Sequence, residues 1–362
     1  MRTIDFKYRV LRGDAVFGYL QTPESGGATI RMQDSAEIKT SLSGTFSPVV
    51  TDFAGREVTP NWLADEIQPI MVVDGVEHLL GVYAPAQVIP SETNGVKSMR
   101  VQAFDRCWRV RDNYTQSLLH FAAGENYVEK IKTLLVASGV AVILATPSDE
   151  VFQEAREDWE IGTSYLKIVN ELLGEINYNP LWFTQNGEAV LEPAAVPLAE
   201  NIEHTISDLP EDLETGAAEI IRMLPSISRE MDIYQSPNVF TCICSNPDKS
   251  GPMIATAENN NPQSPLSIMR RGRRIVKIAR VNNIASQTEL EHYAERLCNE
   301  SMIGGETIRV QTDLQPGFGV ADVVALKYDD LASLCIERAY TMELRVGGTM
   351  SHELKRVVYN LG

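Results

Sequence analysis

The sequence lacks any apolar run of the roughly 18 residues that a membrane-spanning helix requires. The segment Met1–Val10 also lacks the apolar core of a secretory signal peptide. We therefore expect no membrane span. We also expect synthesis in a cytoplasm, with assembly carrying the protein elsewhere.

Basic residues are scarce, with 32 Lys and Arg against 49 Asp and Glu, which gives a formal net charge of −17. Binding to nucleic-acid phosphates needs a basic face, so this balance argues against sequence-specific nucleic-acid binding. One local cluster of basic residues, around Gly272, is an exception to this scarcity. We interpret it as a solvated or partner-facing strand end, and we predict as interface residues Arg270, Arg271, Arg273 and Arg274.

Cysteine and histidine are few and dispersed, with five of each. Only Cys242 and Cys244 lie close together, and strand alternation puts both on one face, where they suit a buried apolar surface. A metal site would need a second cysteine pair or nearby histidines. The sequence therefore predicts no metal and no cofactor. The odd cysteine count in a chain without an export signal indicates reduced thiols.

No familiar catalytic motif is present. There is no Gly-x-Ser-x-Gly, and Gly317–Gly319 lacks the Lys-Ser/Thr and following helix of a phosphate-binding loop. We expect a structural or exposed role for His352. One cluster of acids surrounds Trp159 and consists of Glu154, Glu157, Asp158 and Glu160. Adjacent acids before a helix are more typical of a solvated loop than of two carboxylates held across a cleft. We therefore predict that the protein is not an enzyme.

Residues 1–110 show short strand-like runs separated by turn residues. Asp74-Gly75 lies between two apolar runs and predicts a tight hairpin, because both positions tolerate positive φ. Regularly spaced short strands with few helical patterns favour an antiparallel barrel or sandwich. We predict a first β-barrel domain over this range.

Residues 111–197 change in pattern. Apolar residues at helical spacing predict helices over 127–137, followed by Gly139, and over 164–173. Asn186-Gly187 between two apolar pairs is a strong hairpin signal. The sequence predicts a compact α+β insert of two helices and a hairpin.

Residues 198–362 return to strand-like patterns after an acidic, turn-rich stretch. One helix is predicted over 287–300, with Ser286 as its N-cap and Glu289 as the capping-box partner. Strands are predicted after it, and we expect the helix to lie against a small antiparallel barrel. The rhythm of strands resembles that of the first part, although no residue-level repeat is evident.

Several segments in this order resemble the tail hub, or baseplate hub, proteins of tailed phages and phage-tail-like particles. The resemblance spans nearly the whole chain, and each motif alone is weakly specific. The segments that carry it are 35–46, 65–70, 134–139, 159–173, the 186–187 hairpin, 258–265, 290–297, 319–324 and 350–352.

The resemblance implies an α+β, mainly β fold. Two tail-tube-like antiparallel β-barrel domains are expected, with an α+β insert between them. It implies a homotrimer whose six barrels form a ring of pseudo-six-fold symmetry, joining a hexameric tail tube to a three-fold tip or spike. The implied partners are the tail tube or distal tail protein, the spike or tip protein, the tape measure protein and, in a contractile tail, baseplate wedge proteins. The implied location is the virion tail tip.

Two alternatives are a carbohydrate- or receptor-binding tail-tip module, with exposed Trp159 or Trp182 as a sugar platform, and a peptidoglycan-degrading tail enzyme. Since no further motif follows the last predicted strand before Gly362, lytic activity is expected on a separate chain. An acidic chain would also suit a DNA-conducting lumen that repels phosphate, which we state as a hypothesis.

Overall fold

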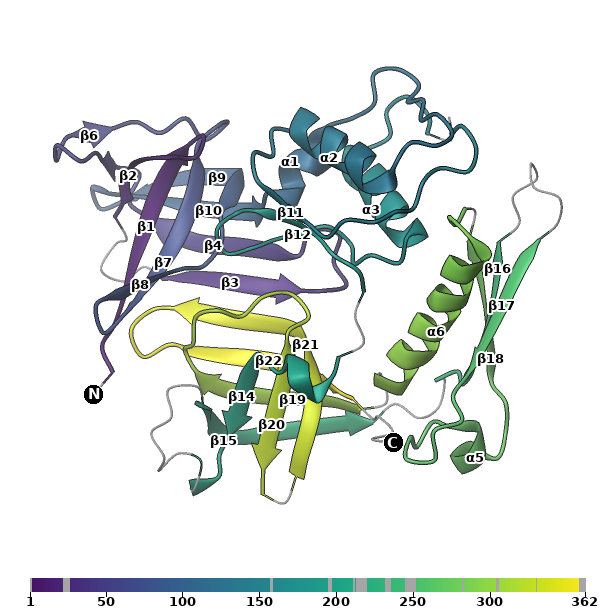
Figure 1. The fold of residues 1–362 in the computed structure, drawn as a ribbon. Helices are drawn as coiled ribbons and strands as arrows, with labels where there is room; N and C mark the ends of the chain where they lie inside the picture. Colours follow the sequence, from purple (N-terminus) through teal and green to yellow (C-terminus); the bar gives the residue numbers. More distant parts are fainter. Residues whose placement is uncertain are drawn as a thin grey trace.

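The computed structural model describes residues 2–21, 27–156, 159–194, 197–210, 212, 220–231, 236–244, 252–281, 283–303, 306–329 and 331–357. Most of them form β-strands, which Figure 1 shows as a curved layer with two helical parts beside it. No helix within the described residues is long and apolar enough to cross a membrane. The mainly β, α+β prediction is confirmed.

The first part of the chain forms an antiparallel sheet. Asp74 and Gly75 both have positive φ, of 49° and 86°, so the predicted hairpin turn is present. The strands and their bounds are β1 (Ile4–Arg12), β2 (Ala15–Leu20), β3 (Ala28–Gln33), β4 (Thr40–Phe46), β5 (Val50–Thr51), β6 (Glu57–Val58), β7 (Glu66–Val73), β8 (Val76–Leu79), β9 (Tyr83–Thr93) and β10 (Val96–Asp105).

The last part of the chain forms a closed six-strand barrel. Its strands are β14 (His204–Ser207), β15 (Ile220–Met231), β19 (Glu306–Asp313), β20 (Val323–Tyr328), β21 (Leu331–Leu344) and β22 (Thr349–Arg356). The barrel is mostly antiparallel, but β14 runs parallel to both β15 and β20. A short 3-10 helix, η1 (Ala199–Asn201), precedes β14.

One hydrophobic core fills both parts. It joins side chains from the first sheet, such as Ile30 and Leu42, to side chains of the barrel, such as Val310 and Met350, all of them at most 2% exposed. The two parts are also joined by hydrogen bonds, because β21 pairs with β3. The two sheets therefore form one body.

The middle of the chain packs as an α+β unit with its own core. The predicted helix over 127–137 is confirmed, with Gly139 at φ 79° after its end, and the second helix lies one or two residues further on than predicted. A short first helix was not predicted. The elements are α1 (Cys107–Asp112), α2 (Tyr127–Ala137), β11 (Ile143–Ala145), α3 (Tyr165–Glu175), β12 (Trp182–Phe183) and β13 (Ala189–Leu191).

A small lobe interrupts the barrel between β15 and β19. A three-stranded sheet is covered on one face by a long helix that begins at Gln287, where Ser286 accepts a hydrogen bond from the Glu289 backbone amide as predicted. Cys242 and Cys244 are buried under this helix, which confirms their core role. The elements are β16 (Val239–Cys244), β17 (Met253–Glu258), α5 (Ile268–Arg271), β18 (Val276–Val281) and α6 (Gln287–Ile303).

The expectation that the helix lies against the barrel was wrong. Helix α6 packs on β16 and β17, and the three strands of this lobe belong to a separate sheet rather than to the barrel wall. The apolar face of α6, which includes Leu290 and Ala294, is satisfied locally by these strands. Helical periodicity identifies an apolar face but not the sheet that covers it.

Candidate assembly surface

Eight strands of the main sheet follow one another in the order β15-β19-β22-β21-β3-β4-β10-β9. This order consists of two successive groups of four strands. We call β3, β4, β9 and β10 the N-terminal unit, and β15, β19, β21 and β22 the C-terminal unit. In each unit the first strand along the chain pairs with the second, the second with the last, and the last with the third, always antiparallel.

The two units also share a β-bulge at the same position. Along the β9–β10 pair, Pro85 faces Ala103 and Gln87 faces Gln102, so Ala86 is the extra residue. Along the β21–β22 pair, Glu337 faces Leu354 and Ala339 faces Glu353, so Arg338 is the extra residue. An extra residue bends and twists the strand that carries it. The third strand of each unit therefore changes direction at an equivalent point.

Beyond its bulge, β21 leaves its own barrel and pairs with β3. Before the bulge its residues 331–336 pair with β20, and after it residues 339–344 pair with β3. On the inner face of this junction Tyr340 lies opposite Met32 and Met342 opposite Ile30, all of them buried. The two units are thus joined through β21, the third strand of the C-terminal unit, and β3, the first strand of the N-terminal unit.

The outer face of these eight strands is polar. Alternation places hydroxyl and amide side chains on it, such as Ser41, Ser43 and Gln311, opposite to the buried core side chains. Its charged residues include both signs in similar number. The basic residues include Arg31, Arg100, Arg309 and Lys355, and the acidic residues include Glu230, Asp313, Glu343 and Glu353.

Inside the barrel, a hydroxyl, an imidazole and a carboxylate form a chain. Thr312 Oγ1 lies 2.9 Å from His352 Nε2, and His352 Nδ1 lies 2.6 Å from Glu337 Oε2. Burial raises the pKa of the Glu337 carboxyl, and the adjacent His352 offsets part of that rise. Such a chain suits nucleophilic catalysis in form. However, all three side chains are at most 2% exposed, so no substrate reaches them, and the structural role expected for His352 agrees with its burial.

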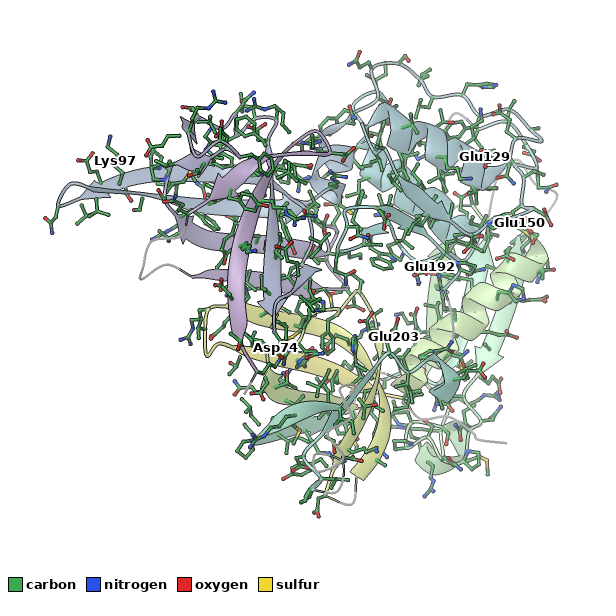
Figure 2. All side chains as sticks on the ribbon, turned by 60° about the vertical axis from the view of Figure 1, so that its left-hand side comes forward. Asp74, Lys97, Glu129, Glu150, Glu192 and Glu203 are labelled. Carbon is green, nitrogen blue, oxygen red and sulfur yellow. The ribbon has the colours of Figure 1, made fainter. Side chains whose placement is uncertain are left out.

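A wide groove of about 1070 Å³ lies between the middle unit, the barrel and α6. Glu150 and Glu192 from the middle unit and Glu203 from the segment before β14 line it, and Figure 2 labels all three around the space between these parts. Burial raises the pKa of Glu203. Among the described residues, no group of three or more His, Cys, Asp and Glu side chains is placed to hold a metal ion.

No known family model matches the sequence. No curated protein matches it either. Solved structures do match in fold along nearly the whole chain. A tail protein from Neisseria meningitidis MC58 has a TM-score of 0.65 at 12% identity and covers 97% of this chain and 96% of its own. The 43 kDa tail protein of prophage MuSo2 from Shewanella oneidensis has a TM-score of 0.63 at 10% identity, with 97% and 98% coverage.

A third similar structure comes from a secretion machine. The E. coli c3393 protein, a component of the type VI secretion system with structural similarity to the T4 tail proteins gp27 and gp5, has a TM-score of 0.54 at 10% identity. It covers 99% of this chain, which spans 78% of that one.

The chain has the fold of phage tail proteins.

The predicted interface arginines lie in the lobe, at the end of α5 and in the segment between α5 and β18. Arg270 and Arg271 end α5, and Gly272 follows with φ 64° as its C-cap. Arg270 Nε donates to the Pro262 carbonyl and Arg274 forms an ion pair with Glu258, so both also hold the lobe together. Arg273 is exposed. Their role in an interface remains a prediction.

The residues predicted for the two alternative functions, sugar binding and peptidoglycan cleavage, lie in different environments. Trp159 is only 4% exposed and its indole donates to Glu171, so it offers no platform for a sugar. Trp182 is half-buried beside the groove and donates to Glu192. Glu154 and Glu160 are exposed, whereas Glu157 and Asp158 lie outside the described residues.

The tandem of two four-strand units was missed by sequence reasoning, which found only a similar rhythm of strands. The equivalent residues differ in chemistry. Val101 in β10 corresponds to His352 in β22, and Phe46 in β4 corresponds to Thr312 in β19. The shared features are strand order, pairing and the bulge, and these leave no residue-level repeat.

Proposed function

We propose that this chain is a structural subunit of a tail or baseplate hub. Three copies form a ring of pseudo-six-fold symmetry that joins a hexameric tail tube to a three-fold tip or spike. The observation that carries the proposal is the tandem of two equivalent four-strand units in one polypeptide. A trimer of such chains presents six equivalent units, and closed symmetry ends growth at the tip.

The fold neighbours support this proposal, because they are tail proteins and a component of a secretion system similar to tail proteins. The partners we propose are the tail tube or distal tail protein, the spike or tip protein and the tape measure protein, with baseplate wedge proteins if the tail contracts. We place the chain in the virion tail tip after synthesis in the bacterial host.

We assign to the chain two barrel domains, over 1–110 and 198–362, and an insert domain over 111–197. A separate core supports the insert, and because Cys107 and Val110 of α1 belong to it, this core begins a few residues before residue 111. The barrel over 198–362 carries the lobe as an insertion with a further core of its own. We propose no enzymatic activity for any of these parts.

We propose that the outer face of the eight-strand sheet lines the bore of the ring. Its hydroxyl and amide side chains and its balanced charges provide few strong contacts for a passing phosphate backbone. This proposal departs from the hypothesis of an acidic lumen, since acids of the described chain gather instead around the groove between the insert, the barrel and α6.

The mass of the purified assembly tests the ring. We expect a three-copy particle by mass photometry and a three-fold ring in negative-stain images, either for the chain alone or after addition of a tail-tube protein. Particles that hold one or two copies under both conditions contradict the proposed function. Incubation with labelled peptidoglycan should release no fragments.

A further inference from the structure

Two long strands of the main sheet each have one unpaired edge within the described residues. Strand β9 pairs with β10 along its length, but with β7 only at Tyr83. Strand β15 pairs with β14 only over 220–222, and with β19 on its other side. Residues 84–93 of β9 and 223–231 of β15 therefore present an open edge each. An open edge is a template for another strand.

The open part of β9 corresponds to the part of β21 that pairs with β3. Both follow the bulge, at Ala86 in one unit and Arg338 in the other. Both belong to hairpins that extend past their own barrel core, and Figure 2 shows Lys97 on the free β9–β10 arm, away from the rest of the molecule. The C-terminal arm is covered by β3, whereas the N-terminal arm has no such cover among the strands described.

The open part of β15 corresponds to β3. Strand β3 pairs with β4 as β15 pairs with β19, and the two pairings align Ala28 with Ile227 and Met32 with Met231. One edge of β3 receives β21. The same edge of β15 is the open one.

We infer that β9 of one copy pairs antiparallel with β15 of the next copy, reproducing the β21–β3 junction between chains. This inference rests on the proposed ring and specifies its contact. Within one chain Tyr340 faces Met32 and Thr341 faces Arg31. Transfer of that register predicts, between neighbouring copies, the pairs Val88–Met231, Ile89–Glu230, Pro90–Arg229, Ser91–Ser228 and Glu92–Ile227.

Burial along the two edges supports this occupant. Val88 and Ile227 are partly buried and pack against the ends of the common core, whereas their counterparts Tyr340 and Ala28, which have a strand neighbour, are buried. Met231 is 51% exposed, and its counterpart Met32 is 1% exposed. The side chains that the internal junction covers are thus left partly open at both free edges.

Charge also fits a strand from a second copy. In the predicted register Glu92 and Arg229 lie on the same face as diagonal neighbours, within reach of one another. One chain carries one open edge of each kind, so the contact is head to tail and is repeated around a closed ring.

Cysteine pairs test the register. All five native cysteines are buried, so introduced thiols at exposed sites are distinguishable. We would combine Ile89→Cys with Glu230→Cys, and separately Val88→Cys with Met231→Cys. Hydrogen-bonded and non-hydrogen-bonded pairs alternate along antiparallel strands, so one of the two pairs has the closer side chains. Under mild oxidation, in the assembled particle, we expect disulfide-linked dimers and trimers on a non-reducing gel for at least one pair.

Three controls define the outcome. Thr341→Cys with Arg31→Cys repeats the test at the internal junction and should give a disulfide within one chain. Ile89→Cys with Ser228→Cys shifts the register by two residues, to about 7–8 Å, too far for a disulfide. Each single variant should give no ladder. Intermolecular bonds in the shifted pair, or none in either predicted pair, overturn the inference. A three-copy particle in that case leaves the proposed function standing, whereas loss of the particle itself counts against the function.

Discussion

The N-terminal and C-terminal units have the same strand order, the same pairing directions and the same bulge, yet they differ in what their equivalent positions hold. In the C-terminal unit Thr312, Glu337 and His352 form a buried polar chain. Their counterparts in the N-terminal unit are Phe46, Pro85 and Val101. Backbone pairing therefore fixes the common architecture, and either an apolar core or a mutually hydrogen-bonded polar one fills it.

The two units also differ in their connections. Strands β3 and β4 are joined by the short segment 34–39, whereas β15 and β19 are separated by the whole lobe. After the last strand, the N-terminal unit continues into Arg106, and the equivalent position after β22 is Val357, which is buried. The two units therefore have the same strands, but the segments inserted between or after those strands give each unit different neighbours.

The largest expected effect on stability is at Arg106, whose equivalent position in the C-terminal unit is Val357. Its guanidinium donates to Glu66, which is fully buried, and to the Gly187 carbonyl of the insert. Arg106→Ala leaves the buried Glu66 carboxylate with only Arg109, which is partly exposed, so we expect a loss of about 3 kcal/mol in the free energy of unfolding. Urea denaturation measures it. Val357→Ala, the matched control in the other unit, should cost about 1–3 kcal/mol. Equal losses in the two variants would mean that the ion pairs of Arg106 stabilise the fold no more than the apolar burial of Val357 does.

A second pair of variants sharpens the contrast between a covered and an open strand. Met32 and Met231 occupy equivalent positions on β3 and β15, with 1% and 51% exposure. Met32→Ala opens a cavity in the core and should cost about 2–5 kcal/mol. Met231→Ala should change the stability of dilute, unassembled chain by no more than about 0.5 kcal/mol. Urea titrations of both variants at low concentration decide this, and similar losses would contradict the equivalence.

A third variant addresses the polar chain that only the C-terminal unit contains. Because burial raises the pKa of Glu337 in the folded state, the unfolded state loses its proton first as pH rises. The contribution of this group is present below the unfolded pKa and is lost as pH rises through the folded pKa. Charged or titratable groups near it are His352, Asp322 and His204.

Glu337→Gln should remove that loss, so the stability of the variant relative to the parent should improve as pH rises from the ordinary carboxyl range through the raised folded pKa of Glu337. The gain should be about 1.4 kcal/mol for each tenfold difference between the acid dissociation constants of Glu337 in the folded and unfolded states. Urea unfolding across this range gives the comparison. Glu353→Gln, on the outer face next to His352 in sequence, is the control that makes the same chemical change at a partly exposed site. Parallel pH profiles for the parent and Glu337→Gln would show that Glu337 does not titrate differently on folding.

Local elements of this fold were accessible from sequence because their causes are local. The helix over 127–137 follows from apolar spacing and Gly139, and the Asp74-Gly75 hairpin follows from two residues that tolerate positive φ. The sheet that covers α6 was not accessible, because an apolar helix face does not specify its partner. The equivalence of the two units was also hidden, because it consists of pairing and of a bulge formed by such different residues as Ala86 and Arg338.

The smallest effect is expected at the arginine cluster of the lobe, the insertion that most distinguishes the C-terminal unit. Arg273 is exposed, so Arg273→Glu should change the free energy of unfolding by no more than about 0.5 kcal/mol. If the cluster contacts an acidic partner surface, the same variant weakens assembly, and added salt reduces the difference, because exposed charges are screened.

Arg56→Glu makes the same charge change in the N-terminal part, where the Arg56 side chain is 78% exposed. Particle yield by mass photometry at low and high salt separates the two variants. Equal assembly by both would remove the cluster from the interface and would leave the lobe as a difference between the units without a role in ring contacts.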